Sequence, residues 1–464
     1  MKNAMLAAAA VLTLAAPAAA QTTYDPVWQP EPYSTVRHPE WSKDAVLYQI
    51  NTRQFTPEGT FRAAERELPR LKALGVNVLW LMPIHPIGAK NRKGTLGSPY
   101  SVRDYYDVNP EFGTKADFRH FVDAAHAAGF HVILDWVANH TAWDNRLVTE
   151  HPDWYEKDWK GDFRPTPWWD WSDIVDLDWL QPGVRKHVGE AMEMWVRDYG
   201  VDGFRADVAG YVPLDFWEKE RARLEAIRPV FMLAEWKSSE LTRKAFDAVY
   251  AWEWHHIVKD IAKGKSDPSA LYGYYAENES AWPRQAMRLT YIENHDSNAW
   301  EGTQYENFGD ALPAMTALAF TGEGLPMVHN GQEACNAKRL EFFEKDPIDW
   351  SQANGCTLGP LIRDLVAFRR ANPALANGQW GGRMSQVVTD QPKQVFAWTR
   401  QTDGNRVVGI FNLSAAPVTA TLSDAHAAGQ YRAFRTGEAV TLTPGQTLTL
   451  APWEYRLMSA AAVR

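Results

Sequence analysis

The sequence predicts an α/β fold: a (β/α)8 barrel with a small domain inserted after its third strand and an antiparallel β-sandwich at the C-terminal end. From about residue 45 to residue 375, short apolar runs alternate with amphipathic stretches, which is typical of parallel strands joined by helices. About eight such units fit this length, which favours a closed barrel over a doubly wound sheet. After residue 376 only short strand-like runs separated by turn residues follow.

The eight predicted barrel strands are short apolar runs. They are residues 46–50, 76–83, 131–136, 203–207, 230–235, 248–252, 289–293 and 325–329. The sixth, residues 248–252, has the weakest pattern. Between the strands, apolar residues recur with helical spacing, which predicts helices. The clearest helical patterns cover residues 61–74, 115–128, 184–199 and 359–370.

Two segments depart from the barrel pattern. Residues 141–178 have little periodicity and many Trp, Asp and Pro residues, and they are too long for an ordinary loop. We therefore expect an inserted domain there, between barrel segments 21–140 and 179–376. Residues 377–464 are expected to form the β-sandwich, with strands that include residues 394–398, 406–412 and 447–450.

Residues 1–20 have the pattern of an export signal. Lys2 gives a positive start, an Ala- and Leu-rich run follows, and three alanines precede Gln21. An N-terminal anchor is the alternative, but the run is too short for a bilayer, and no later run reaches about 20 apolar residues. We expect cleavage near Gln21 and a mature protein in the periplasm or outside the cell.

The chain has two cysteines, Cys335 and Cys356. Export favours a disulfide between them, and two unpaired buried thiols are the alternative.

The charge and the aromatic content of the sequence limit the classes of molecule that the protein is expected to bind. The net charge of −9 comes without a basic run, so neither a nucleic acid nor an anionic membrane surface is expected as a partner. The 22 tryptophans are unusually many. Flat aromatic faces suit the apolar faces of sugar rings, although packing of the core accounts for most of them.

Four segments at strand ends carry carboxylates or histidines. They are residues 135–140 (DWVANH), 203–207 (GFRAD), 234–236 (AEW) and 293–296 (ENHD). The C-terminal ends of barrel strands converge on one site, so these segments can face one another. A lone Asp at such a position is usually a helix cap or an ion-pair partner. Four segments in order on one barrel instead indicate a catalytic site.

The residue types in these segments predict two carboxylates with different roles. Arg205 and Asp207 lie two apart on a strand and point to the same side, so the guanidinium keeps the carboxylate ionised, as a nucleophile requires. Glu235 follows an apolar strand, and apolar surroundings raise the pKa of a carboxyl group, as a general acid requires. Such a pair cleaves glycosidic bonds, and Asp296 would stabilise the positive charge that develops.

These segments resemble the signature regions of the α-amylase family, glycoside hydrolase family 13, and the resemblance extends from residue 46 to the C-terminal sandwich. It implies a retaining α-glycosidase in which Asp207 is the nucleophile, Glu235 the acid/base and Asp296 the third carboxylate. Tyr100, in a segment that resembles another family signature (residues 98–105, SPYSVRDY), would stack on the cleaved sugar. The substrate-binding residues implied are Tyr100, Asp135, His140, Arg205 and His295. Asp104 and Glu333 also match family positions, and structural roles are expected for both.

The resemblance also implies a structural calcium between the barrel and the insert. Its ligands would be Asn139, Asp176 and the Tyr211 carbonyl, and oxygen ligands of these types suit calcium. An Asn139 that hydrogen-bonds the backbone is the alternative. Residues 208–211 (VAGY) lack the Lys-His pair that typical α-amylases carry there, which weakens both the calcium and the endo-acting amylase predictions. The calcium prediction fails if a chelator changes neither bound metal nor thermal stability.

The resemblance therefore implies hydrolysis of α-1,4-glucosidic bonds in starch-like glucans or maltooligosaccharides. An α-glucosidase or transglucosidase on short maltooligosaccharides would use the same residues. A non-catalytic glucan-binding protein is the alternative from another class, and the presence of all three carboxylates argues against it. No nucleotide-binding glycine loop or redox cysteine pair predicts an organic cofactor. The sequence indicates neither the oligomeric state nor endo or exo action.

Overall fold

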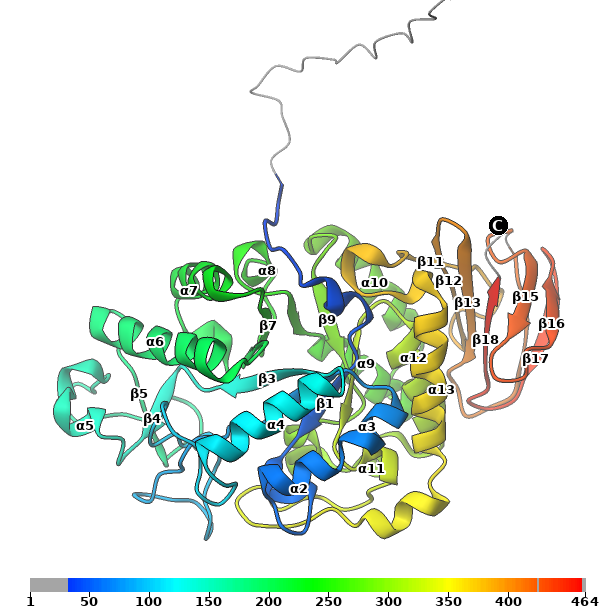
Figure 1. Cartoon of the computed structure of the whole chain (residues 1–464). Helices are drawn as coiled ribbons and strands as arrows, with labels where there is room; N and C mark the ends of the chain where they lie inside the picture. Colours follow the sequence, from blue (N-terminus) through cyan, green and yellow to red (C-terminus); the bar gives the residue numbers. More distant parts are fainter. Residues whose placement is uncertain (1–31, 424, 461–464) are drawn as a thin grey trace, which may run out of the picture. The chain divides into compact units, whose positions relative to one another are not determined.

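Eight parallel strands close into a barrel in the computed structural model, which describes residues 32–423 and 425–460 (Figure 1). In chain order they are β1 (Leu47–Ile50), β2 (Val78–Leu81), β3 (His131–Trp136), β6 (Gly203–Ala206), β7 (Phe231–Ala234), β8 (Ala248–Tyr250), β9 (Met287–Thr290) and β10 (Leu325–His329). Each strand pairs with its neighbour along the chain, and β10 pairs with β1. The predicted (β/α)8 barrel is confirmed. The predicted signal peptide, residues 1–20, lies outside the described residues.

The seventh barrel strand lies earlier than predicted. We expected it at residues 289–293, whereas β9 is Met287–Thr290. Leu289 packs inside the barrel, so Arg288 points to the outer layer, where its guanidinium lies 3.9 Å from the Trp282 ring centroid. This charged residue hid the start of the strand in the sequence. Residues 293–296 consequently lie in the loop that follows β9.

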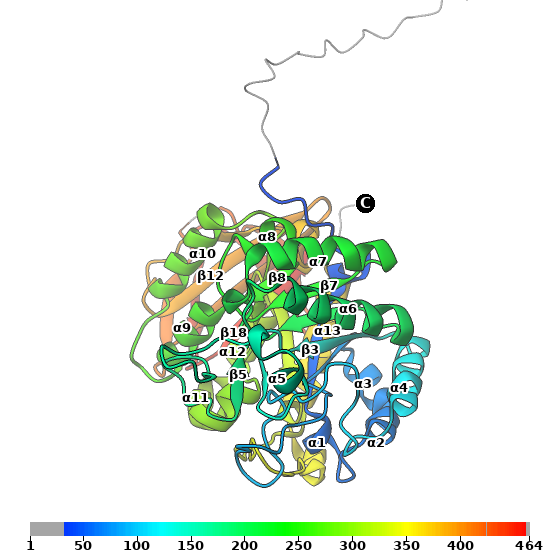
Figure 2. The same cartoon turned by 90° about the vertical axis from the view of Figure 1, so that its left-hand side faces the viewer.

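Helices form a layer around the barrel (Figures 1 and 2). They are α1 (Thr52–Phe55), α2 (Phe61–Arg66), α3 (Leu68–Leu74), α4 (Lys115–Ala127), α6 (Pro182–Tyr199), α7 (Leu214–Ile227), α8 (Leu241–Lys244), α9 (Trp252–Ala262), α10 (Ser269–Ala281), α11 (Gln304–Phe308), α12 (Leu312–Thr321) and α13 (Leu358–Ala371). The single helix predicted at residues 61–74 is two helices that meet at Glu67. Pro69 lies in the first turn of α3, where it lacks an N–H to donate and cannot continue α2.

Apolar side chains fill the barrel interior and the layer between strands and helices. Trp80 and Leu233 are among the interior residues, and Tyr48 and Trp195 are among those of the outer layer. The interior also holds polar side chains that are fully buried, namely Gln49, Asp135 and Arg205. Buried polar groups need partners, and these three find them at the C-terminal end of the barrel.

The insert after β3 is a small antiparallel element. β4 (His140–Ala142) pairs with β5 (Ile174–Asp176), and α5 (Leu147–Glu150) lies between them in the chain. The hydroxyl of Tyr105, in the loop after β2, lies 2.9 and 3.0 Å from the carbonyl oxygens of Val137 and His140 and shares its one proton between them. These bonds fix the start of the insert against the barrel.

The C-terminal residues form two antiparallel sheets. The larger has the strand order β11 (Met384–Gln386), β12 (Val395–Thr402), β13 (Asn405–Asn412), β18 (Tyr455–Ala460), β15 (Gly429–Ala433) and β16 (Ala439–Leu442). The smaller pairs β14 (Val418–Thr421) with β17 (Thr447–Leu450). Both sheets contribute to one apolar cluster that includes Ile410 and Leu450, which confirms the predicted antiparallel sandwich.

Two covalent or polar links tie peripheral segments to the barrel. Cys335 and Cys356 form a disulfide with 5.4 Å between their Cα atoms, as the sequence predicted. The buried Arg400 of β12 donates to the carbonyl oxygens of Gly322, just after α12, and Ala376, at 2.8 and 2.9 Å. Among the described residues, no helix is both long enough and apolar enough to cross a bilayer.

Candidate active site

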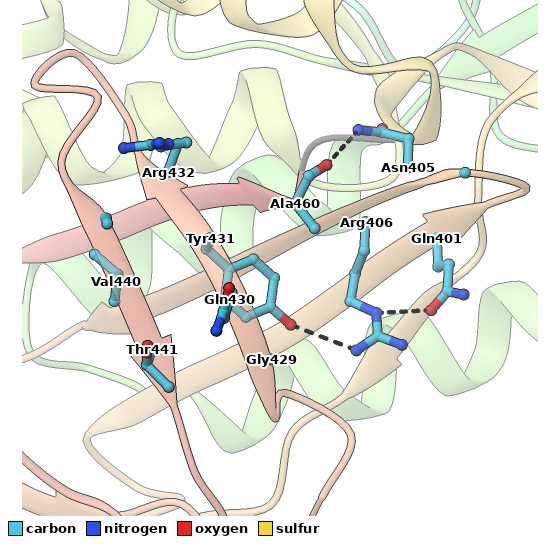
Figure 3. Close-up of a pocket in the computed structure, with 12 residues that line it drawn as sticks. Gln401, Asn405, Arg406, Gly429, Gln430, Tyr431, Arg432, Val440, Thr441 and Ala460 are labelled. Carbon is cyan, nitrogen blue, oxygen red and sulfur yellow. Dashed lines mark hydrogen bonds between the residues drawn. The ribbon is translucent and has the colours of Figure 1, made fainter. Parts of the chain in front are cut away.

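Two cavities among the described residues differ in the side chains that line them. The larger, about 940 Å³, lies on the six-stranded sheet, and Gln401, Arg406 and Tyr431 line it with other polar side chains (Figure 3). No carboxylate lines it. The other, about 510 Å³, lies at the C-terminal end of the barrel. It is lined by Lys93, Ser98, Tyr100, His140, Trp169, Asp170, Trp171, Asp173, Ile174, Asp207, Val208, Glu235, His295, Asp296, Trp300, Phe342 and Phe343. Because catalysis at a glycosidic bond needs paired carboxylates, the second cavity is the candidate active site.

The register of the barrel brings Asp207 and Glu235 together. Ala206 of β6 pairs with Ala234 of β7, so the two carboxylates follow neighbouring strand ends at the same level. The backbone N–H of Glu235 donates to the Ala206 carbonyl at 2.9 Å and extends this pairing by one residue. Both side chains are largely buried and line the cavity.

Val208 has a strained backbone directly after Asp207. Its φ of 36° lies in the left-handed region, which a β-branched residue rarely adopts. This conformation aims its N–H at Glu235 Oε2, to which it donates a hydrogen bond of 2.9 Å. The strain therefore positions a carboxyl group of the site.

Arg205 joins three carboxylates beneath the cavity. Its Nη1 donates to Asp135 Oδ1 at 2.7 Å and to Asp207 Oδ1 at 2.9 Å, and its Nη2 lies 2.8 Å from Glu235 Oε1. Burial opposes its charge, but Asp135 and Glu235 raise the pKa of the guanidinium well above its ordinary value. Arg205 is therefore a permanent cation at the centre of the site.

Burial raises the pKa of Glu235 well above its ordinary value; Arg205 opposes this shift, and the Asp207 and Asp296 carboxylates add to it. The sequence prediction of a raised pKa at Glu235 is confirmed. A raised pKa lets a carboxyl group keep its proton to higher pH, which suits it to act as a general acid.

Asp296, His295 and Tyr100 form one wall of the cavity. Tyr100 Oη lies 2.7 Å from His295 Nε2, and the two rings stack with centroids 5.5 Å apart. Asp296 Oδ2 lies 3.3 Å from the same nitrogen. Burial in the cleft raises the pKa of Asp296 to about 6; Arg205 opposes this shift and Asp207 adds to it.

Two residues that the resemblance assigned to substrate binding lie under the site instead of on its surface. Asp135 and Arg205 are 0% exposed, and neither lines the cavity. Asp135 accepts hydrogen bonds from Trp80 Nε1 and Tyr100 Oη at 3.1 and 3.0 Å, besides the bond from Arg205. In these positions Asp135 holds Tyr100 in the wall of the cavity, and Arg205 holds the carboxyl groups of Asp207 and Glu235. His140 does line the cavity, next to Asp173 of the insert.

The predicted calcium ligands Asn139 and Asp176 lie together but bind each other. Asn139 Nδ2 donates to Asp176 Oδ1 at 3.0 Å, and the Thr166 hydroxyl donates to the same oxygen at 2.5 Å. The Asn139 amide thus turns its N–H groups toward Asp176, and these residues do not fit a calcium ligand set in this arrangement. Among the described residues, no cluster of three or more acidic, His or Cys side chains is suited to a metal. Calcium stays a prediction from the sequence, and no step of the proposed mechanism depends on it.

Glu333 has the structural role that the sequence predicted. Its Oε1 accepts hydrogen bonds from the Tyr48 hydroxyl and from Arg70 Nη1, the latter at 2.7 Å. This carboxylate ties the loop after β10 to β1 and α3.

Several residues of the site were not predicted from the sequence. Gln49 of β1 contacts His295 from below, and Trp300, Phe342 and Lys93 line the cavity above. Gln49 was visible as the polar residue within the apolar run 46–50. The Phe342-Phe343 pair was visible as two aromatic residues in a loop, where apolar packing does not require them.

Three carboxyl groups in one cavity at the C-terminal end of a (β/α)8 barrel, two of them in contact with a buried arginine, are the arrangement of a glycoside hydrolase. The known domain described as "Alpha amylase, catalytic domain" matches residues 49–354, and "Maltogenic Amylase, C-terminal domain" matches residues 384–457. The chain therefore belongs to the α-amylase family, as its strand-end motifs predicted.

Its relatives include enzymes with several named activities. Alpha-amylase MalA of Haloarcula japonica is 29% identical over 401 residues, which cover 83% of this chain and 57% of MalA. A cyclomaltodextrinase of a Bacillus species is 24% identical over 82% of this chain and 75% of its own length. A solved structure, the noncanonic maltogenic alpha-amylase AmyB from Thermotoga neapolitana, is 30% identical, has a TM-score of 0.83, and matches 91% of this chain and 99% of its own. This chain thus spans little more than half the length of MalA.

The raised pKa of Asp296 predicts that its charge destabilises the fold. The folded pKa of Asp296, about 6, lies above its unfolded value, so ionisation of this group costs folding stability. The full cost is present above about pH 6, and there is no cost below about pH 4. Asp296→Asn should therefore raise the free energy of unfolding at high pH. Because the side chain is 43% exposed, solvent screens the repulsion, and we expect a gain of about 1 kcal/mol.

Urea unfolding of both proteins at pH 8 and pH 4 measures this gain. Asp403→Asn, in the exposed turn between β12 and β13, is the matched control for replacing an aspartate by asparagine. An Asp296→Asn protein that is equally stable or less stable than the wild type at pH 8 would contradict the prediction.

Proposed function

We propose that the protein hydrolyses α-1,4-glucosidic bonds in starch-like glucans or maltooligosaccharides, with net retention of anomeric configuration. The observation that carries this proposal is the placement of Asp207, Glu235 and Asp296 in one cavity, with a buried arginine in contact with the first two. Two carboxylates that share one guanidinium lie close together. This favours the separation of about 5–5.5 Å typical of retaining enzymes over the longer separation of inverting ones.

In the first step, Asp207 attacks the anomeric carbon and forms a covalent glycosyl ester, while Glu235 gives its proton to the departing glycosidic oxygen. In the second step, Glu235 takes a proton from water, the water oxygen bonds to the anomeric carbon, and the ester bond to Asp207 breaks. Both carboxyl groups then have their starting protonation states. Arg205 supports both steps because it contacts both groups.

The transition state carries positive charge on the sugar ring. Asp296 lines the cavity beside Asp207 and supplies a negative charge toward that ring. His140 and His295 line the same space and can donate to sugar hydroxyl groups, and the Tyr100 ring gives a flat face for stacking.

Aromatic side chains from separate segments of the chain line the cavity, which favours substrates of more than one sugar unit. Trp169 and Trp171 of the insert stack with ring centroids 5.4 Å apart, and Trp300 packs on Phe342 at 5.3 Å. Trp169 is also held by a hydrogen bond of 2.9 Å from its indole N–H to the Tyr211 hydroxyl. Such rings suit the apolar faces of glucose units in a maltooligosaccharide.

The relatives support the same bond type but not one product. The three described above are named α-amylase, maltogenic α-amylase and cyclomaltodextrinase. An α-glucosidase or transglucosidase acting on short maltooligosaccharides is the second candidate, because water and a sugar hydroxyl can compete for the same covalent intermediate. A non-catalytic glucan-binding protein, the alternative from another class, is disfavoured because all three carboxylates are present in the cavity.

The products from soluble starch and from maltose test the proposal, with Asp207→Asn as the control. We expect maltooligosaccharides from starch, little action on maltose, and at least about a 10⁴-fold loss of kcat in the variant because the nucleophile is absent. Glucose release from maltose would support the α-glucosidase, and products longer than maltose would support transfer. A folded wild-type protein that binds starch without turnover would contradict hydrolysis.

We also propose that the protein is exported and acts in the periplasm or outside the cell. The composition of residues 1–20 supports this, and so does the disulfide, because such bonds persist mainly outside the reducing cytosol. The mass of the protein isolated from its native cells should correspond to a chain that begins near Gln21. A full-length chain found in the cytosol would contradict export.

A further inference from the structure

Gln49 makes two hydrogen bonds to a single histidine of the site. It lies in β1 with its side chain inside the barrel and is 0% exposed. Its Nε2 lies 2.7 Å from the ring nitrogen His295 Nδ1, and its Oε1 accepts from the backbone N–H of His295 at 3.2 Å. One side-chain amide thus contacts both the backbone and the ring of the same residue.

These two contacts determine where the proton of the His295 ring lies. A backbone N–H can only donate, so the amide oxygen of Gln49 must face it. The amide NH2 group of Gln49 then necessarily faces Nδ1 and donates to it. A nitrogen that accepts a hydrogen bond carries no proton, so the single proton of a neutral His295 ring must be on Nε2.

Nε2 is the nitrogen that faces the reaction. It lies 2.7 Å from Tyr100 Oη and 3.3 Å from Asp296 Oδ2, at the wall of the cavity. With its proton on Nε2, His295 donates to the Tyr100 oxygen, and Tyr100 in turn donates to Asp135 Oδ2 at 3.0 Å. The hydrogen bonds therefore run in one direction, from Gln49 through His295 and Tyr100 to Asp135.

The surroundings keep the His295 ring neutral. Burial lowers its pKa well below the ordinary value, and the positive charge of Arg205 lowers it further, followed by His329 of β10. The acidic groups that face the ring are Asp296 in its own loop and, through Tyr100, Asp135 of β3. A neutral ring has one proton, so its position decides whether Nε2 donates or accepts.

We propose that Gln49 is a positioning residue that holds His295 in the tautomer with its proton on Nε2, so that His295 can donate from Nε2 either to Tyr100 or to a sugar hydroxyl group that replaces it as the acceptor. This inference deepens the proposed function and rests on it for its effect on activity. Its structural part, the position of one proton, does not depend on any activity. Gln49 contacts no substrate and acts through His295.

Gln49→Glu tests the proposal because it changes the hydrogen-bonding character of the side chain with almost no change in shape. The ionised carboxylate of this variant can only accept a hydrogen bond, so the single ring proton moves to Nδ1 to donate to it and Nε2 is left without a proton. As the pH falls, the new carboxyl group and His295 together take up one proton. Nε2 then carries a proton again. This holds whether the pair is then a neutral acid beside a neutral ring or a carboxylate beside an imidazolium.

We therefore expect kcat/KM of Gln49→Glu to be about 100-fold below wild type at high pH, the size of effect that misplacement of a catalytic group produces. The kcat/KM of the variant divided by that of the wild type should rise as the pH falls. The rise should be up to about tenfold per pH unit over the range in which the single proton is taken up. A ratio that does not change with pH would overturn the proposal.

Gln332→Glu is the matched control. Gln332 is also 0% exposed at the same end of the barrel, and its Oε1 accepts from the backbone N–H of another histidine, His329, at 3.3 Å. Its side chain makes no hydrogen bond to His295. The same substitution there introduces the same buried carboxyl group, so its activity ratio to wild type should not rise as the pH falls.

Neutron diffraction from deuterium-exchanged crystals of the wild-type protein gives a second measurement that needs neither turnover nor a stable variant. We expect deuterium on His295 Nε2 and none on Nδ1. The deuterated side-chain amide nitrogen of Gln49 should face Nδ1. Deuterium on Nδ1 would overturn the proposal even in an active enzyme. Deuterium on Nε2 in a protein that turns over no glucan would uphold the tautomer and refute the proposed function.

Discussion

The buried guanidinium of Arg205 contacts Asp135, Asp207 and Glu235 at 2.7, 2.9 and 2.8 Å. Acidic groups this close repel one another strongly where water is excluded, and a buried charge that loses its partner costs about 3–5 kcal/mol. One cation at their centre lets these acidic groups lie together at the end of the barrel. Their ionisation still differs, because burial raises the pKa of Glu235 while Arg205 opposes that rise. The site thus depends on a charge that lies beneath it and does not line it.

The barrel places this cation through its strand register and one close approach. Arg205 lies in β6, paired with Asp135 of β3 on one side and Leu233 of β7 on the other. β6 begins at Gly203, where a Cβ atom would lie 1.8 Å from the Phe231 carbonyl oxygen. Only glycine fits this approach, and it brings β6 and β7 together two residues before Arg205. The strained turn at Val208 then directs the chain away from the barrel.

The sequence predicted what depends on local pattern. Apolar runs located all eight strands, and the residues at their ends indicated Asp207, Glu235 and Asp296. The charge of Arg288 broke the apolar pattern of β9, so the predicted strand was shifted toward the C-terminus. At Pro69, one predicted helix proved to be two.

Interactions between distant segments were beyond the sequence. The bond from Gln49 to His295 joins residues 246 positions apart, and that from Tyr100 to His295 joins residues 195 apart. Only the closed barrel brings such residues together. The same holds for Asn139, Thr166 and Asp176, whose mutual hydrogen bonds depend on the path of the insert. Residue type predicts an ion at that place, and the mutual hydrogen bonds of these side chains do not follow from residue type.

The most direct test of Asp207 as the nucleophile is mass spectrometry of the covalent intermediate. A fluorinated α-glucosyl fluoride slows both steps but retains a good leaving group, so the glycosyl-enzyme accumulates. We expect one added fluoroglucosyl group on the peptide that contains Asp207, and none in the Asp207→Asn protein. Attachment to another residue, or turnover of the reagent with inversion and no attachment, would contradict the proposed mechanism.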